Sequence, residues 1–152
     1  MTGIDTIERE VLINAPVAKV WAAVTTAEHI GTWFGNAGAT IDLRPGGTMT
    51  CTWRDGKTTD TVHAVIEKVD EPHLFAFRWA ARPAEEVTGP GNATLVEFTL
   101  TADGDRTRLR VVESGFAELD QTEEQIAAYV ADHAEGWQRE LEELAAHAPT
   151  IA

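Results

Sequence analysis

The sequence of 152 residues has a single cysteine, little positive charge and no long hydrophobic run. Cys51 has no intrachain partner for a disulfide, so we expect a reducing, cytoplasmic environment. Twelve Lys and Arg oppose 25 Asp and Glu, and the resulting net charge of −13 repels nucleic-acid phosphates and anionic lipid surfaces. We therefore expect neither nucleic acid nor a membrane as a partner.

Signals for export, membrane insertion and common cofactors are also missing. No stretch approaches the roughly 20 apolar residues of a membrane span, and the first five residues lack the basic and apolar parts of an export signal. The chain has no dinucleotide-binding turn, no phosphate-binding loop and no Gly-x-Ser-x-Gly elbow. Its five histidines show no metal-ligand spacing, so we expect neither a metal nor a cofactor.

The residues that are present are typical of one globular domain spanning 1–152, with an ordered core over about 6–147. Apolar residues spaced as on a helix predict a helix that follows Asn14 and Pro16, a short second helix with a Thr25–Glu28 capping box, and a long amphipathic helix over about 121–147. Period-two alternation predicts strands at 6–14, 49–53, 59–69, 74–80, 94–101 and 107–114, with a long loop at 82–92.

The order of these elements predicts an α+β domain with one antiparallel sheet covered by the terminal helix. The first strand is followed by two short helices, then by about six more strands in hairpin succession, and last by the long helix. Aromatic strand positions that face an aromatic helix stripe leave irregular space between them. We therefore expect an apolar pocket between sheet and helix.

Short segments in a fixed order over nearly the whole chain resemble a known superfamily. They are Ile13 to Trp21, Trp33-Phe34-Gly35, Pro45-Gly46-Gly47, Val69 to Leu74 before Phe77-Arg78-Trp79, Glu113-Ser114-Gly115-Phe116, and Gly136-Trp137. The chain resembles the START-like, Bet v 1-like helix-grip domains (SRPBCC), and within them the heat-shock-protein-90 ATPase activator-like family.

The resemblance implies a seven-stranded antiparallel sheet that grips the long helix and encloses a cavity for a hydrophobic small molecule. It implies no single reaction, because some members of the superfamily are polyketide cyclases or aromatases and others sequester lipids, hormones or antibiotics. The eukaryotic co-chaperones of the family carry an additional amino-terminal domain, for which this chain has no room. We therefore expect no chaperone partner, and the sequence leaves a homodimer open.

Aromatic residues are the main candidates for ligand contact, because their rings offer large rigid surfaces to flat ligands. The alternative is ordinary core packing, which any sheet and helix domain requires. The candidate ligand-binding residues are Trp33, Phe34, Trp53, Phe75, Phe77, Trp79, Phe98, Phe116, Tyr129, His133 and Trp137.

Three residues are candidates for acid–base chemistry: His133, Glu113 and Tyr129. His133 lies on the inward stripe of the last helix, where it would be a neutral histidine satisfied by a neighbour or a proton shuttle; we expect the former. Glu113 is in phase with inward strand residues, and would pair with a base, contact a ligand or reach solvent at the strand end, which we expect. The acidic face of the last helix, which includes Glu140, is predicted to be solvated.

The function that the sequence favours is binding of a hydrophobic, aromatic or polycyclic small molecule by a carrier, sensor or sequestering protein. The first alternative is a cyclase- or aromatase-like enzyme that uses the same cavity. The second is a protein-interaction module related to the co-chaperone domains.

Overall fold

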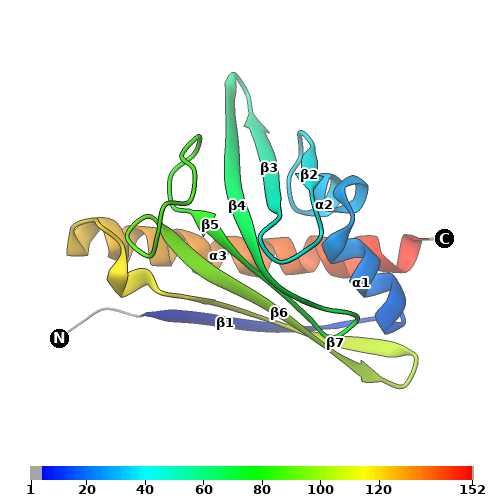
Figure 1. The fold of residues 1–152 in the computed structure, drawn as a ribbon. Helices are drawn as coiled ribbons and strands as arrows, with labels where there is room; N and C mark the ends of the chain where they lie inside the picture. The colour runs from blue at the N-terminus through cyan, green and yellow to red at the C-terminus, as the bar shows by residue number, and fades with distance from the viewer. Residues whose placement is uncertain (1–4, 152) are drawn as a thin grey trace.

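A computed structural model describes residues 5–151 and shows one seven-stranded antiparallel sheet packed against a long carboxy-terminal helix (Figure 1). The strand order is β1-β7-β6-β5-β4-β3-β2. The first strand of the chain therefore lies at one edge of the sheet and pairs with the last strand of the chain. The predicted α+β helix-grip fold is confirmed. Residues 1–4, where an export signal was sought, lie outside the described residues. The elements are β1 (Thr6–Ile13), α1 (Val17–Thr25), α2 (Ala27–Trp33), β2 (Ala39–Ile41), β3 (Thr48–Asp55), β4 (Thr58–Asp70), β5 (Leu74–Ala80), β6 (Ala93–Asp103), β7 (Arg106–Ser114) and α3 (Glu123–His147), with short 3-10 turns at Phe116–Glu118 and Ala148–Thr150.

The strands form where apolar residues alternate with polar ones, and the alternation selects the face that meets α3. In β7, Leu109 and Val111 are buried, whereas Arg108 and Arg110 are exposed and form ion pairs with glutamates of β1. Because this alternation continues to the end of the strand, Glu113 lies on the same inner face as Leu109.

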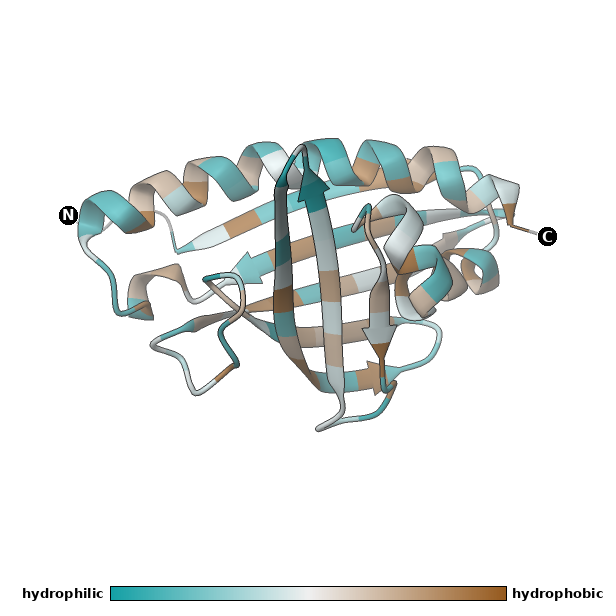
Figure 2. Ribbon diagram, turned by 90° about the horizontal axis from the view of Figure 1, so that it is seen from above, coloured by the Kyte–Doolittle hydropathy of each residue, from teal (hydrophilic) through white to brown (hydrophobic). Residues whose placement is uncertain are grey.

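The long helix begins at a capping box formed by Thr122 and Gln125. The Thr122 hydroxyl accepts a hydrogen bond from the Gln125 amide at 3.1 Å, and the Gln125 side chain accepts one from the Thr122 amide at 3.0 Å. Trp137, Leu141 and Leu144 are buried toward the sheet. Hydrophilic residues colour much of the rest of the helix, as an amphipathic helix on a sheet requires (Figure 2).

The two short helices begin differently from the prediction. Thr25 belongs to α1 and donates its hydroxyl hydrogen bond to the Trp21 carbonyl at 2.7 Å, so the predicted Thr25–Glu28 capping box is wrong. Helix α1 begins after Pro16 with no side-chain cap, which leaves no capping role for Asn14. The Lys19 amide donates to the Pro16 carbonyl, so one amide of the first turn has a backbone partner in place of a side-chain cap.

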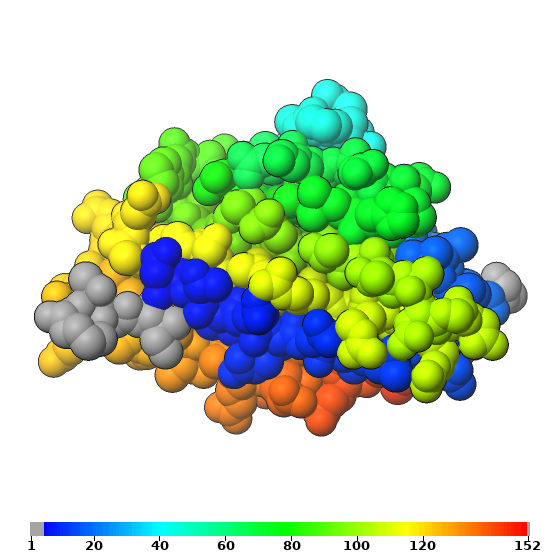
Figure 3. All heavy atoms as spheres, turned by 90° about the horizontal axis from the view of Figure 1, so that it is seen from below, coloured from blue at the N-terminus to red at the C-terminus, as the bar shows by residue number. Residues whose placement is uncertain are grey.

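The free edge of the sheet at β1 is covered by the long helix. Figure 3 shows β1 between β7 and α3 on one face of the molecule, and β1 and α3 are in contact. This cover removes an unpaired strand edge at one end of the sheet. Among residues 5–151, no helix combines the length and the apolar character that a membrane crossing requires.

Candidate functional site

A cavity of about 410 Å³ lies between α3 and the strands β3, β4 and β5. Its volume falls within the range of roughly 300–1,000 Å³ that is usual for small-molecule sites. The apolar wall consists mainly of rings, from Phe34, Trp53, Trp79, Tyr129 and Trp137. The site is therefore built by one helix face against the inner face of three neighbouring strands.

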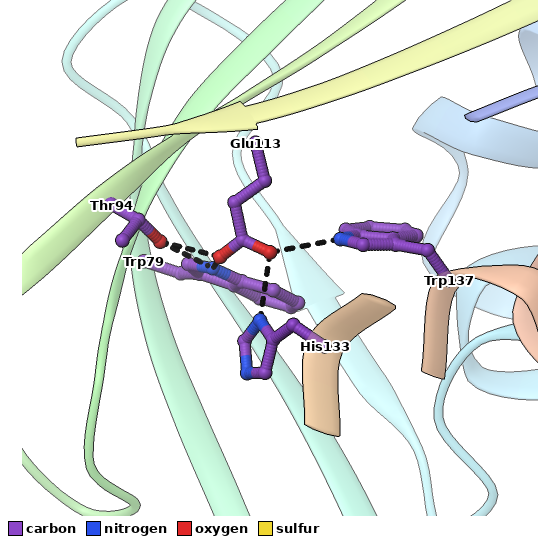
Figure 4. Close-up of polar contacts among 5 residues, drawn as sticks. All are labelled: Trp79, Thr94, Glu113, His133 and Trp137. Atoms are coloured by element: carbon purple, nitrogen blue, oxygen red, sulfur yellow. Dashed lines mark hydrogen bonds and ion pairs between the residues drawn. The ribbon is translucent and has the colours of Figure 1, made fainter. Parts of the chain in front are cut away.

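The carboxyl group of Glu113 lies behind this wall and is fully buried, with 0% of the residue exposed. One oxygen accepts hydrogen bonds from the Trp79 indole at 2.9 Å and from the Thr94 hydroxyl at 2.6 Å. The other accepts from the Trp137 indole at 2.8 Å and is 2.7 Å from the His133 Nδ1 (Figure 4). The expectation that Glu113 reaches solvent is wrong, because the chain continues past the strand end and α3 closes over it.

Burial alone would raise the pKa of Glu113, but the hydrogen bonds from His133, Thr94 and Trp79, together with the charge on His133, hold it below its ordinary value. The carboxylate is therefore ionised at neutral pH. Such a buried anion is tolerated because both oxygens have donors. Glu113, on β7, consequently fixes two tryptophans, a threonine and a histidine from three other elements in one arrangement.

The contact with Glu113 also determines which ring nitrogen of His133 carries a hydrogen. A carboxylate only accepts hydrogen bonds, so the Nδ1 atom carries the hydrogen. The other ring nitrogen points away from Glu113 (Figure 4), and the imidazole, with 17% of its side chain exposed, lines the cavity. The neighbour expected for His133 is thus Glu113, and the histidine presents its Nε2 to the space where a ligand would lie.

Tyr129 lies against His133, with ring centroids 3.9 Å apart. Burial raises the pKa of its phenol, and the negative charge of Glu113 raises it further. The phenol is therefore a hydrogen-bond donor and not a base at neutral pH.

The rings of Phe34, Trp79 and Trp137 form one cluster, with centroids 5.5 to 5.7 Å apart. Phe34 reaches this cluster because α2 ends close to β3. A Cβ atom on Gly35 would lie 2.8 Å from the Thr52 carbonyl oxygen, a distance that only glycine avoids. The next two amides, of Asn36 and Ala37, donate to that same oxygen.

The structure divides the predicted ligand-binding residues into two groups. Phe34, Trp53, Trp79, Tyr129, His133 and Trp137 line the cavity. Trp33, Phe75, Phe77, Phe98 and Phe116 do not line it and are buried in the core. The gap bordered by several of these core rings measures about 10 Å³, which is space for about one water molecule.

Sequence reasoning missed several residues of the site, among them Thr94 and Glu140. Thr94 is fully buried beside Glu113, and its position in phase with Phe98 was the available signal. Glu140 was assigned to the solvated face of the last helix, which is wrong, because it lies at the edge of the buried stripe and lines the cavity.

Two further residues have simpler roles in the structure. A Cβ atom on Gly136 would meet nothing closer than the Arg139 side chain at 3.9 Å, so no strand packs closely against it, and it borders the cavity. Cys51 is buried, and its burial, with the charge of Glu140, raises the pKa of the thiol to about 12. The thiol therefore behaves as a small core side chain.

Solved structures with this fold include proteins from several bacteria. DynU16, a protein in the dynemicin biosynthetic locus, is 26% identical with a TM-score of 0.74, over 97% of this chain and 48% of its own. The chain thus spans about half of DynU16. CalU16 from Micromonospora echinospora is 23% identical (TM-score 0.66, 95% of this chain and 76% of that one). A protein from Arthrobacter aurescens is 18% identical (TM-score 0.77, 97% and 87%).

Family membership comes from the sequence comparison. No curated protein matches the chain. The family model described as "Activator of Hsp90 ATPase homolog 1-like protein" matches residues 14–148, a span that runs from the end of β1 through the whole of α3. The chain therefore belongs to the Activator of Hsp90 ATPase homolog 1-like family.

Proposed function

We propose that the protein binds a hydrophobic, aromatic small molecule in the cavity between α3 and β3 to β5, as a carrier, sensor or sequestering protein. The observation that carries this proposal is the aromatic wall, whose orientation is fixed from behind. Both indole N–H groups of Trp79 and Trp137 are used on Glu113, so the rings present carbon surface to the cavity.

A wall that is fixed before the ligand arrives favours affinity. Each side chain that must be ordered on binding costs about 0.5–1.5 kcal/mol, and the hydrogen bonds to Glu113 remove that cost for both tryptophans. DynU16 belongs to a biosynthetic locus, which is a setting where proteins handle small molecules, and this likeness supports the proposal.

The proposal is tested with N-phenyl-1-naphthylamine, an apolar dye that is neutral at pH 7 and fluoresces in dry surroundings. We expect saturable binding with one site per chain. Trp53→Ala should weaken binding by about tenfold, because this partly exposed ring lines the cavity and makes no side-chain hydrogen bond on which the fold depends.

The matched control is Leu43→Ala, which removes an exposed apolar side chain that does not line the cavity. Equal dissociation constants for the two variants would place the dye elsewhere and overturn the proposal. Native mass spectrometry of the same complexes gives the stoichiometry.

A second candidate function, an acid–base reaction of the cyclase or aromatase type, is favoured by the pairing of His133 with Glu113. In the neutral form of a histidine whose Nδ1 hydrogen is held by a buried carboxylate, the Nε2 atom is free to accept a proton from a molecule in the cavity. The neighbouring Tyr129 phenol would donate a hydrogen bond to a developing oxyanion.

The probe for this candidate is 5-nitrobenzisoxazole. A base removes its ring C–H proton, the electron pair forms a nitrile and the N–O bond breaks to leave a phenolate. We expect a catalysed rate that falls at least tenfold in His133→Ala while the affinity for N-phenyl-1-naphthylamine changes less. A rate that is unchanged in the variant removes His133 from this role.

A further inference from the structure

Glu140 is the polar group of the cavity that the binding proposal leaves unexplained. It extends from α3 into the cavity wall, and its Oε2 atom is buried with no hydrogen-bond partner. Within residues 5–151 it is the one buried side-chain nitrogen or oxygen in this condition. Since buried polar atoms are almost always paired, the Oε2 atom of Glu140 is an exception that a polar ligand group would remove.

The charges around the cavity are mostly negative. The carboxylates of Asp60 and Asp132 line it, and Glu140 adds a third negative charge whenever it is ionised. The cationic groups that line it are the Arg139 guanidinium and, when protonated, the His133 imidazole, which is paired with Glu113. Glu113, ionised, lies behind the aromatic wall. These carboxylates belong to a chain with a net charge of −13, so the field in the cavity attracts cations and repels anions.

The aromatic rings of the cavity wall also favour a cation over an anion. The faces of Trp53, Trp79 and Trp137 carry the negative part of the aromatic quadrupole, and a cation within about 6 Å of such a face is attracted to it. An ammonium group in the cavity that these rings line would donate a hydrogen bond to the Oε2 atom of Glu140.

From this geometry we infer that the cavity selects aromatic ligands that carry a protonated amine, and that Glu140 is the residue that recognises the ammonium group. The inference rests on the proposed binding function and specifies its ligand class. The cavity would then distinguish an amine from an alcohol or a carboxylate that has the same ring.

Binding of an ammonium group beside Glu140 should also release a proton from its carboxyl group. Burial, together with the charge of Glu143, raises the pKa of Glu140 to about 8, although Arg139 lowers it. At pH 7 the free protein therefore holds a proton on this carboxyl. A ligand that arrives as an ammonium ion favours the carboxylate, so the proton leaves to solvent as the ion pair forms.

The test is calorimetric titration at pH 7 with three probes: naphthalen-2-ylmethylamine, naphthalen-2-ylmethanol and 2-naphthoate. We expect the amine to bind about tenfold more tightly than the alcohol and the naphthoate more weakly than both. Titrations in two buffers of different ionisation enthalpy should show proton release with the amine alone. In Glu140→Gln, the amine should lose its advantage over the alcohol and the proton release should disappear.

The matched control is Glu142→Gln, which removes an exposed carboxylate from the same helix outside the cavity and should keep the preference. Equal affinities of amine and alcohol in the unmodified protein, or an amine preference that survives Glu140→Gln, would overturn the inference and leave the binding function standing. If none of the three naphthalenes binds while N-phenyl-1-naphthylamine does, the inference alone fails. If no probe binds, the binding function fails with it.

Discussion

At the scale of single residues, Glu113 organises the site. It lies on β7, and its partners come from β5, β6 and α3: Trp79, Thr94, His133 and Trp137. The register places Trp79 opposite Thr94, and Val96, two residues on, opposite Glu113, so three neighbouring strands bring the polar groups together. The sequence predicted that Glu113 points inward, but the partners depend on where α3 crosses the sheet, which strand alternation does not determine.

Glu113→Gln tests this role. The substituted amide would replace one acceptor oxygen by a nitrogen donor, so the indole N–H of Trp79 or of Trp137 would lose its hydrogen bond to residue 113. We expect the free energy of unfolding at pH 7 to fall by about 2–4 kcal/mol, measured by urea denaturation.

The difference in unfolding free energy between wild type and Glu113→Gln should depend on pH. The folded-state pKa of Glu113 is below its ordinary value of 4.5, so the carboxylate contributes stability above pH 4.5 that is lost as the pH falls through the folded-state pKa. The difference between wild type and Glu113→Gln should therefore narrow below pH 4.5. A difference that stays constant down to pH 3 would contradict the ionised carboxylate.

At the scale of elements, the aromatic wall depends on how α2 meets β3. The sequence indicated Trp33-Phe34-Gly35 as a recognisable unit, but β2, which follows it, was missed because a strand of three residues has no measurable alternation. The close approach of Gly35 to the Thr52 carbonyl is equally invisible in the sequence, since both the helix end and the strand must be in place before their separation exists.

Gly35→Ala should displace the end of α2 from β3. The added Cβ atom would lie 2.8 Å from backbone, which does not move aside as a flexible side chain does. We expect a loss of about 1–3 kcal/mol in unfolding free energy and a changed near-ultraviolet circular dichroism of the tryptophans, because Phe34 packs on Trp79 and Trp137. Gly89→Ala, where an added Cβ atom would meet nothing within 4 Å, is the control and should leave both signals unchanged.

At the scale of the whole molecule, the fold was accessible from the sequence and the site was accessible only in part. Alternation along strands and a 3.6-residue stripe along α3 are local signals, and they were enough to predict an α+β domain with one antiparallel sheet under a long helix. The seven-stranded helix-grip arrangement was implied by the family resemblance. For Glu140 these local signals are not sufficient. It follows Trp137 by three residues, so it lies at the border of the stripe, and only the packed structure decides whether a border residue faces solvent or a cavity.

The stability of the whole protein should therefore depend on pH in a way that a solvated Glu140 would not produce. The folded-state pKa of Glu140, raised by burial to about 8, exceeds its ordinary value of 4.5, so folding favours the protonated carboxyl. Its contribution is fully present below pH 4.5 and is lost as the pH rises through 8.

The contribution of His147 to stability increases with pH, opposite to that of Glu140, because burial, together with the charge of His29, lowers the pKa of His147. Its contribution is present above the ordinary histidine value of 6.5 and declines as the pH falls below it. The window between pH 6.5 and 8 therefore isolates Glu140 from His147. Over this window we expect the unfolding free energy of the wild type to decrease by about 1 kcal/mol, since partial exposure of Glu140 weakens the full effect. In Glu140→Gln the decrease should be absent, whereas Glu142→Gln should retain it; parallel curves for wild type and Glu140→Gln in urea denaturation would show that the carboxyl is solvated.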